Sequence, residues 1–244
     1  MNPTERFTDR ASDYVLGRPA YPEECLNALF EGLGDPTAIT VADLGAGTGI
    51  SSRLLAASGA RVIAVEPNVA MSEQGESAPN LKWQTATAEK TGLPSASADL
   101  VTAFQAFHWF DPKAAITEII RILRPGGRAA LVYNERDEND AFTAAYGALV
   151  RKYATDETEL RRSNGRETFA TDSVWRQVRG LELRNTQQLD RAGLHARAGS
   201  TSYLPKHGPA AAELQTAIDK LFDAHDVDGS ITMHMKTIAT IADL

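Results

Sequence analysis

The chain has one cysteine in 244 residues, Cys25. A single thiol excludes an internal disulfide and any metal site built from several cysteines. Away from His108, the four remaining histidines have no metal-ligand spacing with one another or with the carboxylates. The sequence therefore predicts no metal centre, and we expect Cys25 to be a small core residue.

Long apolar runs and an excess of basic residues are also missing. No stretch approaches the roughly 18 apolar residues that span a bilayer, and the first residues, MNPTERFTDRASDYV, are too polar for a secretory signal. The 25 Lys and Arg are outnumbered by 32 Asp and Glu, for a net charge of −7. This charge disfavours surfaces that follow nucleic-acid phosphates or anionic lipid. We expect a cytoplasmic protein, monomeric or homodimeric, that binds neither nucleic acid nor membrane.

Short apolar runs alternate with helical stretches between residues 39 and 134. The apolar runs are ITVADL, ARVIAVE, LKWQTA, ADLVTAFQAF and GRAALVYN. Strands separated by helices form a parallel sheet covered on both faces, with right-handed crossovers. The pattern predicts a doubly wound, Rossmann-like α/β domain.

The rhythm changes after residue 134. An amphipathic helix is expected over 135–154, a polar and weakly periodic stretch over 155–173, and a strand near 183–190. A strong helix follows Pro209, and SITMHMKTIATIADL alternates as a final strand would. We therefore expect one domain over 1–244, divided into an N-terminal lid segment (1–35), a cofactor-binding core (36–134), a helical cap and substrate region (135–205), and a final helix and strand (206–244).

A glycine-rich loop, ADLGAGTGISS, stands between the first predicted strand and the following helix. Gly45, Gly47 and Gly49 let the backbone turn tightly and approach a ligand closely, and free amides at the helix start face that ligand. Glu66 closes the second predicted strand, where a carboxylate can bind both hydroxyls of a ribose. The loop and the acid together predict a nucleoside-containing cofactor.

Asp43 separates two kinds of cofactor. It stands two residues before the first glycine, where a carboxylate would repel a pyrophosphate and attract the ammonium group of a methionine moiety. The G-x-G-x-G spacing also differs from the G-x-G-x-x-G of dinucleotide binders. Both features favour a methionine-derived cofactor over NAD.

The chain resembles class I S-adenosylmethionine-dependent methyltransferases, in the group of quinone-biosynthesis and trans-aconitate-type small-molecule enzymes (methyltransferase type 11). The similarity is carried by ADLGAGTG, VIAVEPN, TATAEKTGLP, DLVTAFQAFHWFD and ILRPGGRAALV, in order. It implies a seven-stranded sheet whose last strand is antiparallel, and S-adenosylmethionine as cofactor. The cofactor-binding residues that it implies are Asp43, Gly45, Ala46, Gly47, Thr48, Gly49, Glu66, Pro67, Met71, Ala88, Glu89, Gln105 and Ala106.

Two further segments resemble a bacterial subgroup of this family. In RFTDRASDYVLGRPAYP, which closes over the cofactor in that subgroup, Tyr14 and Arg18 are further candidates for cofactor binding. The second segment, LDRAGLHARAGSTSYLP, resembles the subgroup's cap.

Methyl transfer from a sulfonium is an in-line displacement in which the protein mainly aligns the nucleophile and removes water. His108, just after the fourth predicted strand, is the candidate general base, because imidazole titrates near neutrality. Trp109 is expected to form a pocket wall, Arg136 could bind an acidic acceptor through paired hydrogen bonds, and Tyr203 is a further acceptor-site candidate. The acceptor is expected to be a small molecule.

Three alternatives remain at this stage. An NAD(P)-dependent oxidoreductase would share the fold, but in this sequence no Tyr-x-x-x-Lys pair follows the fifth predicted strand. A non-catalytic cofactor-binding module would keep the motifs without the activity. A nucleic-acid methyltransferase would need an Asn/Asp-Pro-Pro-aromatic motif, a Pro-Cys nucleophile or a basic stripe, and the sequence has none of them.

Overall fold

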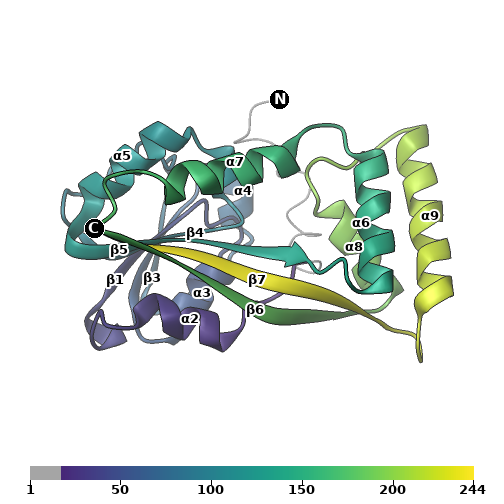
Figure 1. The fold of residues 1–244 in the computed structure, drawn as a ribbon, viewed down its shortest axis with the longest axis horizontal. Helices are drawn as coiled ribbons and strands as arrows, with labels where there is room; N and C mark the ends of the chain where they lie inside the picture. Colours follow the sequence, from purple (N-terminus) through teal and green to yellow (C-terminus); the bar gives the residue numbers. More distant parts are fainter. Residues whose placement is uncertain (1–17) are drawn as a thin grey trace.

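A computed structural model describes residues 18–244, with the side chain at position 159 excepted. Seven strands form one sheet in the order β3-β2-β1-β4-β5-β7-β6 (Figure 1). Neighbours among β1 to β5 run parallel, whereas β7 is antiparallel to both β5 and β6. The predicted fold class is therefore confirmed. The strands are β1 Thr40–Leu44, β2 Arg61–Val65, β3 Leu81–Gln84, β4 Ala98–Phe104, β5 Leu123–Arg136, β6 Gln177–Leu189 and β7 Ile231–Asp243.

Helices cover both faces of the sheet (Figure 1). On one face Leu29 and Leu55, from α2 and α3, pack into a core with β1 and β2; on the other, Ile119 and Phe169, from α5 and α7, pack into a second core. The short α4 follows β2. These helices are α2 Glu23–Phe30, α3 Ile50–Ala57, α4 Val69–Ser72, α5 Pro112–Ile122 and α7 Thr158–Ala170.

A third core lies at the end of the molecule where β6 and β7 extend beyond the parallel strands (Figure 1). It joins α6 Ala141–Tyr153, α8 Arg191–Gly199 and α9 Pro209–His225 to the first residues of β7. Strand β6 and helices α6 to α8 lie in the range 135–205, and α9, from the final segment, packs on α6 and α8.

The polar stretch 155–173 contains a helix, α7, that the weak periodicity did not predict. Its inward residues do recur at helical spacing, since Gly165 and Phe169 are buried and Arg162 and Arg166 half-buried. Three of these four residues are not apolar, which is why the hydrophobic pattern is faint. Among the described residues, no helix is both long and apolar enough to cross a membrane.

Candidate active site

The glycine-rich loop leaves the carboxyl end of β1, beside the point where the strand order reverses between β1 and β4. Ligands of open α/β sheets bind in the crevice at this point. Gly45, with φ of +66°, could not carry a side chain, because an added Cβ would lie 2.6 Å from the Cβ of Ala106. Gly47 and Gly49 also have positive φ, at +59° and +75°. At Gly45 the loop therefore presents backbone atoms and no side chain to the segment that follows β4.

Glu66 follows β2 and faces this loop. Its carboxylate accepts hydrogen bonds from the backbone N–H groups of Gly47 and Asn68, each at 2.9 Å. The side chain is buried, and burial raises its pKa above the ordinary value. The hydrogen bond from Gly47 joins Glu66 to the glycine loop.

Asp43 lies behind the loop and is fully buried. Its carboxylate accepts hydrogen bonds from the hydroxyls of Ser51 (2.7 Å), Ser52 (2.6 Å) and Thr102 (2.8 Å). Burial raises the pKa of Asp43. The carboxylate thus joins β1 to β4 and to the first turn of α3, and its partners are hydroxyl groups.

A cavity of about 240 Å³ opens between the loop, Glu66 and the segment after β4. Nine of the residues proposed for the cofactor from the sequence line it: Gly45, Gly47, Glu66, Pro67, Met71, Ala88, Glu89, Gln105 and Ala106. Asn68, Thr87, Trp109 and Phe110 complete the wall. We call this space the cofactor cavity.

The other residues proposed for the cofactor do not line this cavity. Asp43 and Thr48 are fully buried, and Gly49 begins α3 close to Trp83. Ala46 lines a small neighbouring cavity together with Arg18. Tyr14 lies outside the described residues.

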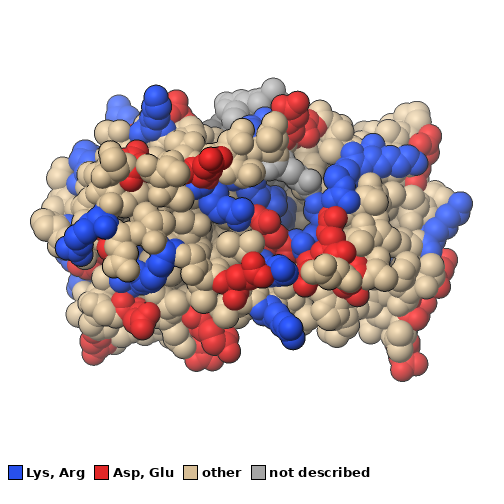
Figure 2. Space-filling model, viewed as in Figure 1, with Lys and Arg blue, Asp and Glu red and all other residues tan. Residues whose placement is uncertain are grey.

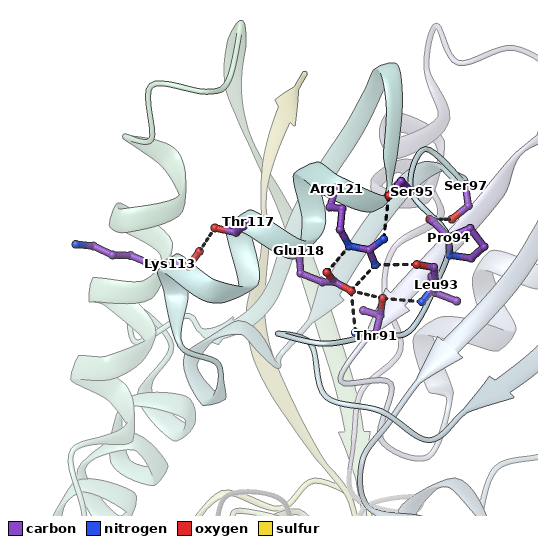
Figure 3. A network of polar contacts seen from close by, with 9 residues as sticks. All are labelled: Thr91, Leu93, Pro94, Ser95, Ser97, Lys113, Thr117, Glu118 and Arg121. Carbon is purple, nitrogen blue, oxygen red and sulfur yellow. Dashed lines mark hydrogen bonds and ion pairs between the residues drawn. The ribbon is translucent and has the colours of Figure 1, made fainter.

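A polar network fixes the loop that carries Ala88 and Glu89 to helix α5 (Figure 3). Glu118 accepts from the backbone N–H and the hydroxyl of Thr91, at 2.8 and 2.5 Å, and from Arg121 Nε at 2.7 Å. Arg121 also donates to the carbonyl of Leu93 at 2.7 Å. The hydrogen bonds from Arg121 lower the pKa of Glu118 to about 2.

Gln105 ends β4 in a left-handed conformation, with φ of +54°. Such backbone costs about 1 kcal/mol or more for a residue other than glycine and clusters at functional sites. Its backbone N–H donates to the carbonyl of Val132, and its side-chain amide donates to the carbonyl of Asn134 at 3.0 Å. These two bonds hold Gln105 between the cofactor cavity and a second cavity.

The second cavity, of about 50 Å³, shares Gln105 and Trp109 with the cofactor cavity. It brings together the proposed base His108 and the three acceptor-site candidates Trp109, Arg136 and Tyr203. Arg18, expected at the cofactor, also lines it, and its guanidinium donates to the carbonyl of Ser200 at 2.9 Å. We call this space the arginine cavity.

Several residues of the arginine cavity were not found from the sequence. They are Asn134, Tyr146, Arg162, Arg197, Thr201 and Ser202. Most lie on the cap helices or the segments beside them, where no motif marks a site. Burial raises the pKa of Tyr146 and lowers that of Arg197 to about 10, so Arg197 is still protonated at neutral pH.

The sequence and the fold are both similar to those of known proteins. Residues 42–131 match the family described as "Methyltransferase domain". An uncharacterized methyltransferase of Mycobacterium tuberculosis is 39% identical over 145 residues, 59% of this chain and 58% of that protein. Residues 42–131 are thus similar to a methyltransferase domain, and the chain spans less than two thirds of the length of this relative. This finding confirms the resemblance to class I methyltransferases that the motifs indicated.

Two further similarities extend this result. A demethylmenaquinone methyltransferase of Clavibacter sepedonicus is 38% identical over 96 residues, 37% of this chain and 39% of that protein. A structure from Anaeromyxobacter dehalogenans assigned as a type II methyltransferase is 25% identical, with a TM-score of 0.70 over 93% of this chain and 97% of that one. The whole architecture, cap included, is therefore found in another methyltransferase fold.

The matched domain ends at residue 131, and the two cavities differ in how many of their residues lie within the matched range. Every residue lining the cofactor cavity lies inside the matched range. In the arginine cavity Arg136, Arg162 and Arg197 lie beyond it. The cofactor cavity therefore lies wholly within the matched range, whereas most residues of the arginine cavity lie outside it.

Proposed function

We propose that the chain transfers a methyl group from S-adenosylmethionine to a small-molecule acceptor. The observation that carries the proposal is a pair of adjoining cavities with two shared wall residues, Gln105 and Trp109. One cavity offers the Glu66 carboxylate, which can accept from ribose hydroxyls, beside apolar side chains that suit a base, and the other is polar and charged. Methyl transfer needs two such sites, because the acceptor must reach the methyl carbon in line with the bond that breaks.

The residues of the cofactor cavity fit S-adenosylmethionine. Glu66 would accept hydrogen bonds from the ribose hydroxyls, Met71 and Ala88 would contact the adenine, and the bare backbone at Gly45 would let the methionine part approach. Asp43 would act through its charge rather than by contact, since hydroxyl groups surround its carboxylate. A negative charge behind the loop favours an ammonium group and disfavours a pyrophosphate, which favours this cofactor over NAD(P).

When bound, S-adenosylmethionine supplies an activated methyl group whose bond to sulfur breaks as the acceptor's nucleophile attacks. The chain's own residues align that nucleophile and exclude water. His108 is buried beside Trp109, with ring centroids 4.6 Å apart, and lines the acceptor side. It would remove a proton from a hydroxyl or amine acceptor, and a carboxylate acceptor would need no base.

Titration of the purified chain with S-adenosylmethionine, S-adenosylhomocysteine, NAD and NADP tests the cofactor assignment. A ligand that binds only the folded state raises the apparent stability of the protein by mass action. A rise in Tm therefore reports binding, and titration calorimetry then measures the heat of binding. We expect the two adenosyl compounds to bind and the nicotinamides not to. Binding of a nicotinamide alone would overturn the proposal.

Two variants extend this test. Glu66→Gln should weaken S-adenosylhomocysteine binding at least about tenfold, because a carboxylate that accepts from hydroxyls is replaced by a neutral amide. Glu76→Gln, at an exposed carboxylate outside the cavity, is the matched control and should bind like the parent. Equal affinity of both variants would remove Glu66 from the site.

A further inference from the structure

The arginine cavity has four guanidinium groups in its wall, and no Asp or Glu of the described chain lines it. The four come from separate parts of the chain: Arg18 precedes α2, Arg136 ends β5, Arg162 lies on α7 and Arg197 on α8. Figure 2 shows basic side chains around a hollow between α7 and α6, with acidic side chains at its lower edge. The fold thus gathers positive charge at one point of a protein whose net charge is −7.

Two of these arginines illustrate the surroundings of the cavity. Arg136 lies 3.6 Å from Glu138, a carboxylate that also pairs with Arg151. The Nε of Arg162 is buried and has no hydrogen-bond partner among the described residues, and its guanidinium stacks over the Tyr133 ring at 5.6 Å from the centroid. Gathering like charges away from water is costly unless an anion or hydrogen-bond acceptors compensate.

The nature of the wall restricts the ligand. Guanidinium groups bind carboxylates and phosphates through paired, charge-assisted hydrogen bonds, and tyrosine and serine hydroxyls from Tyr203 and Ser202 add further donors. At about 50 Å³ the arginine cavity is much smaller than the cofactor cavity of about 240 Å³, and this favours a small acceptor whose far end extends toward Gln105 and Trp109. An apolar acceptor would place apolar surface against these guanidinium groups, which is unfavourable for charged groups.

We infer that the acceptor is a small acid with at least two anionic groups, carboxylate or phosphate, held by the arginine cavity. The inference rests on the proposed methyl transfer. The anionic end would bind Arg136, Arg162 and Arg197, and the group to be methylated would lie toward Gln105 and Trp109, which face the cofactor cavity as well. Arginine at this site sets which acceptors bind.

Calorimetry on the full chain, saturated with S-adenosylhomocysteine, tests the inference with three probes of similar size. These are propane-1,2,3-tricarboxylate, glycerol 2-phosphate and the neutral propane-1,2,3-tricarboxamide. We expect an anion to bind at least about tenfold more tightly than the amide, with affinity that falls as salt rises. Tighter binding of the tricarboxylate identifies a carboxylic acid acceptor, and tighter binding of the phosphate identifies a phosphomonoester.

Variants separate charge from shape. Arg162→Gln should weaken the preferred anion at least about tenfold, and Arg162→Lys should restore part of the loss because it keeps the charge. Arg176→Gln, at an exposed arginine outside the cavity, removes the same charge and should bind the anion like the parent. An equal loss in Arg162→Gln and Arg176→Gln would contradict a specific anion site.

The two proposals fail in different ways. If S-adenosylhomocysteine does not bind the parent chain, the proposed function fails before any acid is added. If it binds but the anions bind no better than the amide, only the acid-acceptor inference is overturned.

Discussion

The network around Glu118 offers a direct test of how the loop at the cofactor cavity is held. In Glu118→Gln the side chain keeps its shape but loses its charge, and its amide N–H₂ would face the donors of Arg121 or Thr91. The parent carboxylate accepts from both residues, and Arg121 contributes two of these bonds, at 2.7 and 2.8 Å. We expect the variant to be less stable and to bind S-adenosylhomocysteine more weakly.

The size of the effect follows from the pKa of Glu118. A fall from 4.5 to about 2 corresponds to roughly 3 kcal/mol of stabilisation of the charged form. The Arg121 side chain is 38% exposed, so water screens part of this attraction. We therefore expect Glu118→Gln to lower the free energy of unfolding by about 2 kcal/mol, which lowers Tm by about 6 °C in a chain of this size.

The dependence on pH has a defined sign. Because the folded-state pKa of Glu118 lies below the unfolded value, the stabilisation is complete above about pH 4.5 and is lost as the pH falls toward 2. Urea unfolding of parent and variant at pH 7, 5 and 4 should give a difference that is constant at first and then narrows. Glu182→Gln, which removes an exposed partner of Lys236, is the control and should leave stability unchanged.

Two outcomes would refute this account of the network. Equal unfolding free energies of parent and Glu118→Gln at pH 7 would mean that the hydrogen bonds contribute nothing to stability. A difference that is as large at pH 4 as at pH 7 would mean that the charge of Glu118 is not its source.

The remaining predictions concern the glycine loop and the ion pair between β5 and β7. Gly45→Ala and Gly126→Ala both place alanine at positive φ, +66° and +78°, but only the first brings a Cβ against Ala106. Calorimetry should therefore show that Gly45→Ala abolishes S-adenosylhomocysteine binding and that Gly126→Ala does not. Equal binding by both variants would contradict the close approach of Gly45 to Ala106. Arg128→Met should lower the unfolding free energy in urea by about 2–3 kcal/mol, because the half-buried Asp243 carboxylate loses the charged donor at 2.6 Å and keeps Arg179 at 3.0 Å. A loss below about 1 kcal/mol would show that this pair is replaceable.

The parallel part of the fold and the cofactor cavity could be predicted because their signals are local in sequence. A strand, a glycine loop and an acid at the end of the next strand occupy residues 40–66, and their backbone geometry brings them together. Gln105 and Ala106 follow β4, whose carboxyl end meets that of β1 in any sheet of this order. Position along the chain was therefore enough to place them.

The partners of Asp43 were not predicted, although its position was. Ser51 and Ser52 belong to the same motif, but serine hydroxyls in a first helical turn most often bond the helix backbone. Thr102 is 59 residues away in sequence and meets Asp43 only because β4 pairs with β1. Pattern alone does not reveal which carboxylate oxygens are already occupied.

The arginine cavity was predicted only in part, for a physical reason. Helix α7 turns arginines inward, so the side chains that would mark its buried face have the composition of a solvent-exposed surface. Arg197 lies on α8, and the cap brings it beside Arg136, from the end of β5. The meeting of these residues does not depend on local spacing. Arg136 was proposed for the acceptor from its place just after a strand, and Arg18 was proposed for the cofactor.

The two cavities lie in different parts of the chain, and this limits what similar proteins can show about the identity of the acceptor. The conserved function of a fold resides in its sites rather than in its topology, and here the two sites have separate structural origins. The cofactor cavity is built by β1, β2, β4 and the segments after them, inside residues 42–131. The arginine cavity depends on the end of β5, α7 and α8, outside that range. A relative that matches only the shared domain therefore predicts the cofactor of this chain, whereas its acceptor must be argued from the arginines that the cap supplies.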